Sequence, residues 1–360
     1  MNAATAAVHR PPSAKLLVVD KHGSVQHWAR SDFPGLLRAG DLVIANDAAT
    51  LPASLEGVHE RTGEPIEVRL AGRDSVTLDE ITQFTAVVFG AGDFYIRTED
   101  RPLPPALRVG DRLALGPLVA RVKRVLGHPR LVLLQLLATP AEIWEGLARH
   151  GRPIQYSHLK DRLAIWDTWT SIAGPPVAFE APSAGFMLDW TIISSLQRGG
   201  IRFETLTHAA GISSTGDASL DALLPFPEPY RIPAPTVKAL EHARAEGGRV
   251  IAIGTTVVRA LEHAARDGWI REGEGLATQR IGPSTALRVV DAILSGVHEP
   301  GTSHYELLRA FVPDETLRRA DHELEAHGYL THEFGDSVYL ERSRVATRDE
   351  VGLEDARKVA

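Results

Sequence analysis

Residues 249–265 read RVIAIGTTVVRALEHAA and combine a short apolar run, a tight turn and an amphipathic segment. Residues 250–253 are all apolar, which predicts a buried strand. Gly254 permits a sharp turn, and Thr255 and Thr256 stand where the following helix would begin. Their hydroxyls and the backbone N–H groups at the positive helix end suit a phosphate, a carboxylate or a ribose. A plain N-cap by either threonine explains the same residues and stays open as an alternative.

The rest of the C-terminal half repeats this alternation of strands and helices. Residues 201–207 alternate like a strand, and residues 235–246 predict a helix that Gly247-Gly248 ends. Near the N-terminus, residues 15–20 and 41–46 are two further short apolar runs. Alternating strands and helices are typical of an α/β domain, and the two ends of the chain both contribute to it.

Residues 55–137 have a different texture. Short β-prone runs such as 65–70, 84–89 and 131–136 alternate with turn residues, and no long segment with helical periodicity interrupts them. The segment therefore predicts a small all-β barrel. The resulting fold class is α/β: a discontinuous, barrel-like α/β domain formed by residues 13–54 and 138–341, with the barrel inserted at residues 55–137 and flexible tails at residues 1–12 and 342–360.

Composition excludes several classes of protein. The 360 residues include no cysteine, which excludes disulfides, thiolate metal sites and a cysteine nucleophile. The 39 Lys and Arg against 46 Asp and Glu give a net charge of −7, so any affinity for nucleic acid must come from the arrangement of charges. There is no apolar stretch of about 20 residues and no signal-peptide pattern, so we predict a cytoplasmic protein that is not inserted in a membrane.

Several polar residues follow predicted strands and are candidates for a site. Asn46-Asp47 ends one run, and His208 ends another. Ser183 lies in the segment Ala181–Gly185, which lacks the first glycine of a nucleophile elbow, so Ser183 is a cap or a substrate contact. Polar loops at the ends of strands often bind ligands in α/β folds.

Histidines and carboxylates recur in the chain, which raises a metal centre as an alternative. The residues concerned include His158, His208, His298, Glu299, His304, His332, Glu333 and Asp336. Their spacing matches no compact ligand motif such as His-Glu-x-x-His, and scattered histidines usually make ordinary hydrogen bonds. The sequence therefore predicts no metal site.

Taken together, these segments resemble the S-adenosylmethionine:tRNA ribosyltransferase-isomerase family of queuosine biosynthesis. The matching stretches keep the family's order and are Lys15–Asp20, Gly40–Asp47 with Pro52-Ala53, Ala181–Gly185, Thr207-His208, Glu228 with Tyr230, Arg249–Thr256 with Val258-Arg259 and Leu261-Glu262, Val289–Leu294, His298 with Pro300, and Gly335-Asp336.

The resemblance implies a reaction and a set of residues for it. The family transfers the ribosyl part of S-adenosylmethionine to the aminomethyl group of a 7-deazaguanine at the tRNA wobble position and isomerises it, releasing adenine and methionine. Its partners would thus be S-adenosyl-L-methionine as co-substrate and tRNA. By position, the resemblance implies catalytic roles for Asp47, His208, Glu228 and Asp336, and substrate contacts for Asn46, Ser183, Gly185, Gly254, Thr255, Thr256, Arg259, His298 and Gly335.

The chain also departs from the family pattern. The family's Asn-Asp-Thr-Arg is here Asn46–Ala49, its Pro-Ala-Arg is residues 52–54, its His-Ser-Glu is residues 226–228, and its His-Leu-Pro-Lys-Ser-Thr is residues 298–303. Three positive charges and one imidazole are thereby lost. The alternatives are a diverged paralogue that acts as a transferase or lyase on a nucleoside-like small molecule, a non-catalytic binding module, and a hydrolase with a histidine metal site.

Overall fold

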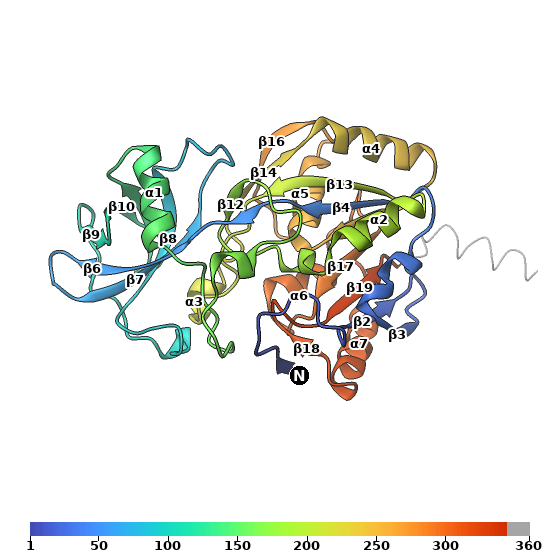
Figure 1. The fold of residues 1–360 in the computed structure, drawn as a ribbon, viewed down its shortest axis with the longest axis horizontal. Coiled ribbons are helices and arrows are strands. Elements are labelled where there is room, and N and C mark those ends of the chain that lie inside the picture. The colour runs from blue at the N-terminus through green and yellow to red at the C-terminus, as the bar shows by residue number, and fades with distance from the viewer. Residues whose placement is uncertain (344–360) are drawn as a thin grey trace, which may run out of the picture.

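The computed structural model describes residues 1–343, and Figure 1 shows a large sheet with a small barrel at one end of the molecule. Of the tail predicted at residues 342–360, the part from residue 344 on lies outside the described residues. Arg342 itself is docked, because its guanidinium donates to Asp291 at 2.9 Å. The predicted fold class, α/β with an inserted barrel, is confirmed.

The large sheet has nine strands. Its order is β16 (Gly273–Ala277), β14 (Glu228–Ile232), β13 (Arg202–His208), β4 (Leu42–Asn46), β15 (Val250–Ile253), β17 (Ala292–Gly296), β19 (Ser337–Glu341), β2 (Lys15–Val19) and β3 (Val25–Ala29). Strands β13, β4, β15 and β17 are mutually parallel. The sheet runs from edge strand β16 to edge strand β3 without closing, so the barrel-like form expected for this part is wrong. Antiparallel strand pairs extend the sheet at both sides instead: β14 with β16 at one side and β2 with β3 at the other.

Helices cover both faces of the sheet. Leu42 and Ile44 point to the layer that contains α4 (Ala234–Ala245), α5 (Thr255–Ala264) and α7 (Asp314–Ala326). Val43 and Ala45 point to the opposite layer, which contains α2 (Trp190–Arg198) and the 3₁₀ turn η1 (Arg30–Leu36). Strands buried on both faces need apolar residues at every position, which explains the continuous apolar runs in the sequence.

The second part is a closed antiparallel barrel. Its strands are β6 (Ser54–His59), β7 (Pro65–Gly72), β8 (Gln83–Phe89), β9 (Arg112–Leu115), β10 (Leu118–Val125) and β11 (Leu131–Leu136). Helix α1 (Pro140–His150) begins with a capping box between Thr139 and Glu142 and packs Ile143 and Leu147 into the barrel core. The sequence assigned this helix to the α/β part. We propose that the inserted domain covers residues 55–137 with α1 as its cover.

The N-terminal segment is docked, so the flexible tail predicted at residues 1–12 is wrong. Strand β1 (Asn2–Ala3) pairs in parallel with β18 (Leu330–Thr331). The ring of His9 stacks on Phe186 at a centroid distance of 4.0 Å and bonds the carbonyl of Asp167 at 2.7 Å. These residues are ordered because β1 pairs with a strand that is distant in the sequence. The local sequence does not indicate this pairing.

The remaining elements are all short. They are β5 (Ala49–Thr50), β12 (Pro176–Ala178), α3 (Ala218–Asp221), α6 (Ser303–Leu308), and the 3₁₀ turns η2 (Thr98–Asp100), η3 (Ile165–Thr168) and η4 (Ser183–Met187). Helix α7 was not predicted, because its charged sequence leaves an apolar stripe of only Leu317, Ala320 and Leu324.

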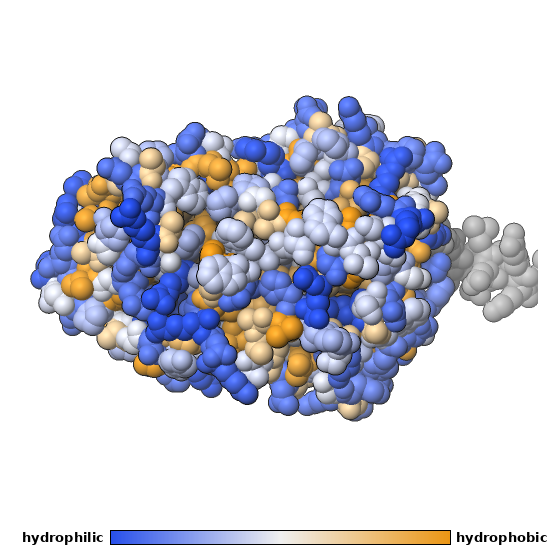
Figure 2. All heavy atoms as spheres, viewed as in Figure 1, coloured by the Kyte–Doolittle hydropathy of each residue, from blue (hydrophilic) through white to orange (hydrophobic). Residues whose placement is uncertain are grey.

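Two surface properties bear on where the protein can act. The face in Figure 2 is mainly hydrophilic, and its hydrophobic residues form small scattered patches. Within residues 1–343, no helix combines the length and the apolar character that a membrane span requires.

Candidate active site

A pocket opens at the carboxyl ends of the parallel strands, where ligands bind in open α/β sheets. Its volume is about 290 Å³, and Ile253 of β15 and Ser295 and Gly296 of β17 line it. One wall includes Ile212 and Leu224, which also belong to the core shared with the barrel. The inserted barrel therefore supports one side of the pocket.

The turn between β15 and α5 forms a central part of this pocket. Gly254 has a φ of +94°, a conformation that favours glycine, and it is the N-cap of α5. The expected alternative, a side-chain cap by Thr255 or Thr256, is wrong: no side chain caps this helix, and both threonines line the pocket. The helix N-terminus therefore keeps free N–H groups for a ligand oxygen.

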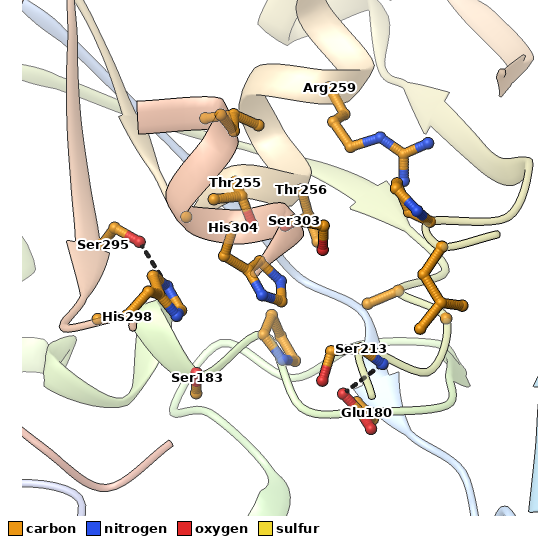
Figure 3. Close-up of a pocket in the computed structure, with 18 of the residues that line it drawn as sticks. Glu180, Ser183, Ser213, Thr255, Thr256, Arg259, Ser295, His298, Ser303 and His304 are labelled. Atoms are coloured by element: carbon orange, nitrogen blue, oxygen red, sulfur yellow. Dashed lines mark hydrogen bonds between the residues drawn. The ribbon is translucent and has the colours of Figure 1, made fainter. Parts of the chain in front are cut away.

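Two sides of the pocket face each other. In Figure 3, Thr255, Thr256 and His304 lie opposite Ser183 and Glu180. Ser183 comes from η4, and His304 comes from the start of α6. Segments far apart in sequence thus meet around one cavity.

Asn46 is a structural clamp at the edge of the pocket. Its side-chain amide donates to the carbonyl of His208 at 2.9 Å, and its side-chain oxygen accepts the N–H of His208 at 2.9 Å. The amide also lies 3.4 Å from the hydroxyl of Thr256. Asn46 therefore fixes the ends of β4 and β13 next to the helix turn, and it is not among the residues that line the pocket.

The ring of His208 is completely buried. Its Nε2 lies 3.4 Å from a carboxylate oxygen of Glu228, and neither ring nitrogen has a hydrogen-bond partner within residues 1–343. Burial lowers the pKa of His208 well below the usual value, with the charge of Arg259 adding to the effect. The imidazole is thus neutral at pH 7 and does not line the pocket.

Glu228 and Arg259 line the pocket, but they bind each other. The guanidinium of Arg259 donates to Glu228, and it also reaches the carbonyls of Ala277 at 3.1 Å and Phe226 at 3.3 Å. The other oxygen of Glu228 accepts the N–H of Gly211 at 2.6 Å. Both charges are therefore committed to the protein, which differs from the free catalytic acid and free substrate contact that the resemblance implies.

Asp47 and Asp336 are not among the residues that line the pocket, and the catalytic roles expected for them stay predictions. Asp47 accepts the hydroxyls of Thr205 at 3.0 Å and Thr207 at 2.7 Å, and burial raises its pKa. Asp336 accepts the N–H of Lys15 at 2.7 Å and that of Leu330 at 2.9 Å. Each carboxylate therefore ties together segments that are far apart in the sequence: Asp47 through two threonine hydroxyls, and Asp336 through backbone N–H groups.

We expect the Asp336→Ala variant to lose about 2–4 kcal/mol of unfolding free energy, because two partly buried N–H groups lose a charged, buried acceptor. Urea denaturation followed by circular dichroism measures this loss. Asp20→Ala is the matched control, since Asp20 also accepts two backbone N–H groups but in an exposed turn. Equal losses in the two variants would contradict the structural role of Asp336.

The other expected contacts divide into two groups. Ser183, Gly254 and His298 line the pocket, whereas Gly185 and Gly335 do not. His298 accepts or donates a hydrogen bond with Ser295 at 3.0 Å. Gly335 packs so tightly that an added Cβ would lie 2.4 Å from the carbonyl of Leu330, which explains why glycine is needed there.

Glu180, His304 and Glu333 are ionisable residues of the pocket that were not predicted as site residues. Burial raises the pKa of Glu180 to about 7 and that of Glu333 to about 8. Burial also lowers the pKa of His304 to about 4, and its ring stacks on that of His298 at 4.6 Å. At neutral pH the pocket therefore holds neutral imidazoles and partly protonated carboxyls. Only the fold brings these residues together.

Comparison with known proteins places the chain in a family. The model of the family described as "Queuosine biosynthesis protein" matches residues 1–340. The chain belongs to this family. This member is 31% identical over 343 residues to the S-adenosylmethionine:tRNA ribosyltransferase-isomerase of Thiobacillus denitrificans, covering 93% of this chain and 92% of the relative. It is 30% identical over 338 residues to the protein of the same name from Thermus thermophilus, covering 91% and 92%.

A solved structure also resembles this queuosine family member. It is that of S-adenosylmethionine tRNA ribosyltransferase from Thermotoga maritima, with a TM-score of 0.49 and 21% identity. The match covers 94% of this chain and 95% of the solved chain.

Proposed function

We propose that this chain is an S-adenosylmethionine:tRNA ribosyltransferase-isomerase. It would transfer and isomerise the ribosyl moiety of S-adenosyl-L-methionine onto 7-aminomethyl-7-deazaguanine at the tRNA wobble position, giving epoxyqueuosine. The observation that carries the proposal is the family match over residues 1–340 together with about 30% identity to relatives of that name. Action on tRNA would place the protein in the cytoplasm, as the cysteine-free sequence predicts.

The pocket offers groups of the kind that a nucleoside needs. The uncapped start of α5 presents N–H groups and the hydroxyls of Thr255 and Thr256. Ser183 faces them across the cavity. Hydroxyls and N–H groups that converge in a concave site are suited to bind ribose oxygens and carboxylates, and S-adenosylmethionine carries both.

The reaction needs a proton donor and a base, and the pocket contains residues for both roles. Adenine leaves more readily when it is protonated, and Glu180 is a carboxyl that burial keeps partly protonated at pH 7. The N–H of Ser213 donates to Glu180 at 3.1 Å and fixes its position. A proton beside the sulfonium must also be removed, and the neutral ring of His304 is placed to accept it. We propose Glu180 as the acid and His304 as the base.

Binding of tRNA would depend on surfaces outside the pocket. Arg259 is paired with Glu228, and the exposed Arg280 donates to the carbonyl of Ala222 at 2.8 Å. These are the two cationic side chains among the pocket residues, apart from histidine. Phosphate contacts on the surface would make the affinity for tRNA strongly dependent on salt.

The test is an assay of adenine release. Purified protein is mixed with S-adenosylmethionine and tRNA that carries the aminomethyl-deazaguanine, and adenine, methionine and the modified nucleoside are quantified. We expect adenine, methionine and epoxyqueuosine in equal amounts, and none of them with tRNA that carries guanine at the wobble position. No product in the presence of binding to S-adenosylmethionine would overturn the tRNA reaction.

The shortage of free cationic side chains in the pocket favours a second candidate function. On the family resemblance, three positive positions are lost, and Arg259 is committed to Glu228. A diverged paralogue would act as transferase or lyase on a free nucleoside-like molecule. The same assay with free 7-aminomethyl-7-deazaguanosine distinguishes the two, because only the paralogue would release adenine with the nucleoside and not with tRNA.

A further inference from the structure

A cluster of potential metal ligands lies beside the pocket, although the sequence predicts no metal. The ring nitrogens of His158 and His332 and the carboxylate of Glu333 each offer an atom within 4.8 Å of the other two. His158 Nε2 lies 3.5 Å from Glu333 Oε2. The two imidazole rings are nearly parallel, with centroids 4.5 Å apart. Residue 158 follows α1, whereas residues 332 and 333 lie between β18 and β19, so the fold alone joins them.

Two atoms of this cluster that face each other make no hydrogen bond to the rest of the described chain. His158 Nε2 and Glu333 Oε2 are both buried, and neither has a hydrogen-bond partner within the described part of the chain. Buried polar atoms are nearly always hydrogen-bonded, so each exception calls for an explanation such as a bound ion or water. A cation between the imidazole and the carboxylate would satisfy both atoms at once.

The backbone at His332 is strained. His332 has a φ of +68°, and it is the one residue other than glycine with positive φ among residues 1–343. Residues with a Cβ rarely adopt positive φ, and those that do are enriched at functional sites. Here the strained conformation carries the ring that stacks on His158.

We propose that His158, His332 and Glu333 bind one divalent transition-metal ion of the zinc class. Two imidazoles and one carboxylate are ligands that suit Zn²⁺ better than Mg²⁺ or Ca²⁺. Bond lengths of about 2.0–2.2 Å place tetrahedral ligand atoms roughly 3.3 Å apart, close to the separation between His158 and Glu333. Three protein ligands leave a fourth position for water or substrate.

The site adjoins the pocket. Glu333 lines the pocket, so an ion bound to it would lie at the pocket wall. This inference does not rest on the proposed function.

The chain contains a matched control for this site. His27, Glu323 and His327 form another group with the same ligand types and similar spacing. There the atoms are already bonded: His27 contacts Tyr329 at 2.9 Å and Glu323 at 3.3 Å. His327 bonds the carbonyl of Glu323 at 3.0 Å. We expect no ion in this control group.

The test is titration of the full chain, freed of metal by EDTA and dialysis, with Zn²⁺ by calorimetry and with Co²⁺ by visible absorption. We expect one equivalent to bind, and His332→Asn and Glu333→Gln to weaken binding about a hundredfold or more. Asparagine is chosen because it tolerates positive φ. His27→Ala and His327→Ala should bind like the unaltered chain. Absence of binding, or loss in the control variants with retention in His332→Asn, would overturn the proposal.

Discussion

The Arg259→Ala variant is expected to lose about 3–5 kcal/mol of unfolding free energy, because the substitution leaves the buried carboxylate of Glu228 without its cation. Arg259 is 5% exposed and Glu228 is 7% exposed, so solvent cannot replace the lost partner. The carbonyls of Ala277 and Phe226 lose a donor as well. Urea denaturation of the purified variant at pH 7 measures the loss.

Arg280→Ala is the control for this experiment. Arg280 also lines the pocket, but it is exposed and donates to a single carbonyl, so its removal should cost less than about 1 kcal/mol. The double variant Arg259→Ala, Glu228→Ala should lose less than the sum of the two single variants, since neither charge is then left alone. A stable Arg259→Ala variant with weak substrate binding would instead favour the substrate contact that the family resemblance implies.

The strand, turn and helix in residues 249–265 were predictable from sequence, because the chain there follows local rules at every step. Residues 250–253 form β15, Gly254 takes a positive φ, and α5 begins at Thr255. The same is true of α1 (Pro140–His150), because Thr139 and Glu142, which form its capping box, are only three positions apart in the sequence. Local signals of this strength suffice to define the fold class.

The roles of Asp47 and Asp336 were not predictable, because their partners lie far away in sequence. Asp336 accepts the N–H of Lys15 across 321 positions, and Asp47 accepts the hydroxyl of Thr207 across 160. A carboxylate near a strand end looks the same whether it faces a ligand or the backbone of a distant segment. Only the packed sheet distinguishes the two.

The pocket residues Glu180, His304 and Glu333 were missed for the opposite reason. Each is isolated in sequence, and none forms a motif with its neighbours. The sequence names His304 and Glu333 only among the histidines and carboxylates of a possible metal centre, and it gives no signal for Glu180. Their pKa shifts arise from burial in the folded chain, a property that residue type and spacing do not carry.

Replacement of Glu180 with glutamine is expected to lower kcat for adenine release about a hundred- to ten-thousandfold, because glutamine cannot donate a proton to the leaving base. The amide keeps the size of the side chain and an oxygen that can accept the N–H of Ser213. With a pKa of about 7, the protonated acid is lost as the pH rises, so the rate of the unaltered chain should fall above pH 7. The residual rate of Glu180→Gln should lack this fall.

Glu204→Gln is the control, because Glu204 also has a pKa raised by burial but lies on β13 away from the pocket residues. It should leave kcat unchanged. An unchanged kcat in Glu180→Gln would show that Glu180 has no catalytic role. If the variant is slow but its rate still falls above pH 7, another group causes that pH dependence. The charged groups that face Glu180 are Arg69, Asp221 and Glu333, and they are intact in both variants.

The stability of Glu180→Gln tests the pKa of Glu180 without any reference to catalysis. Because burial raises this pKa from 4.5 to about 7, folding favours the protonated carboxyl. Its contribution to stability is complete below pH 4.5 and is lost as the pH rises through about 7. The shift corresponds to about 3 kcal/mol, so Glu180→Gln should be more stable than the unaltered chain by that order at pH 8.5 and equal to it at pH 4.5. Urea denaturation of metal-free protein at the two pH values measures the difference. If the variant and the unaltered chain are equally stable at both pH values, Glu180 ionises freely and is not a protonated acid at neutral pH.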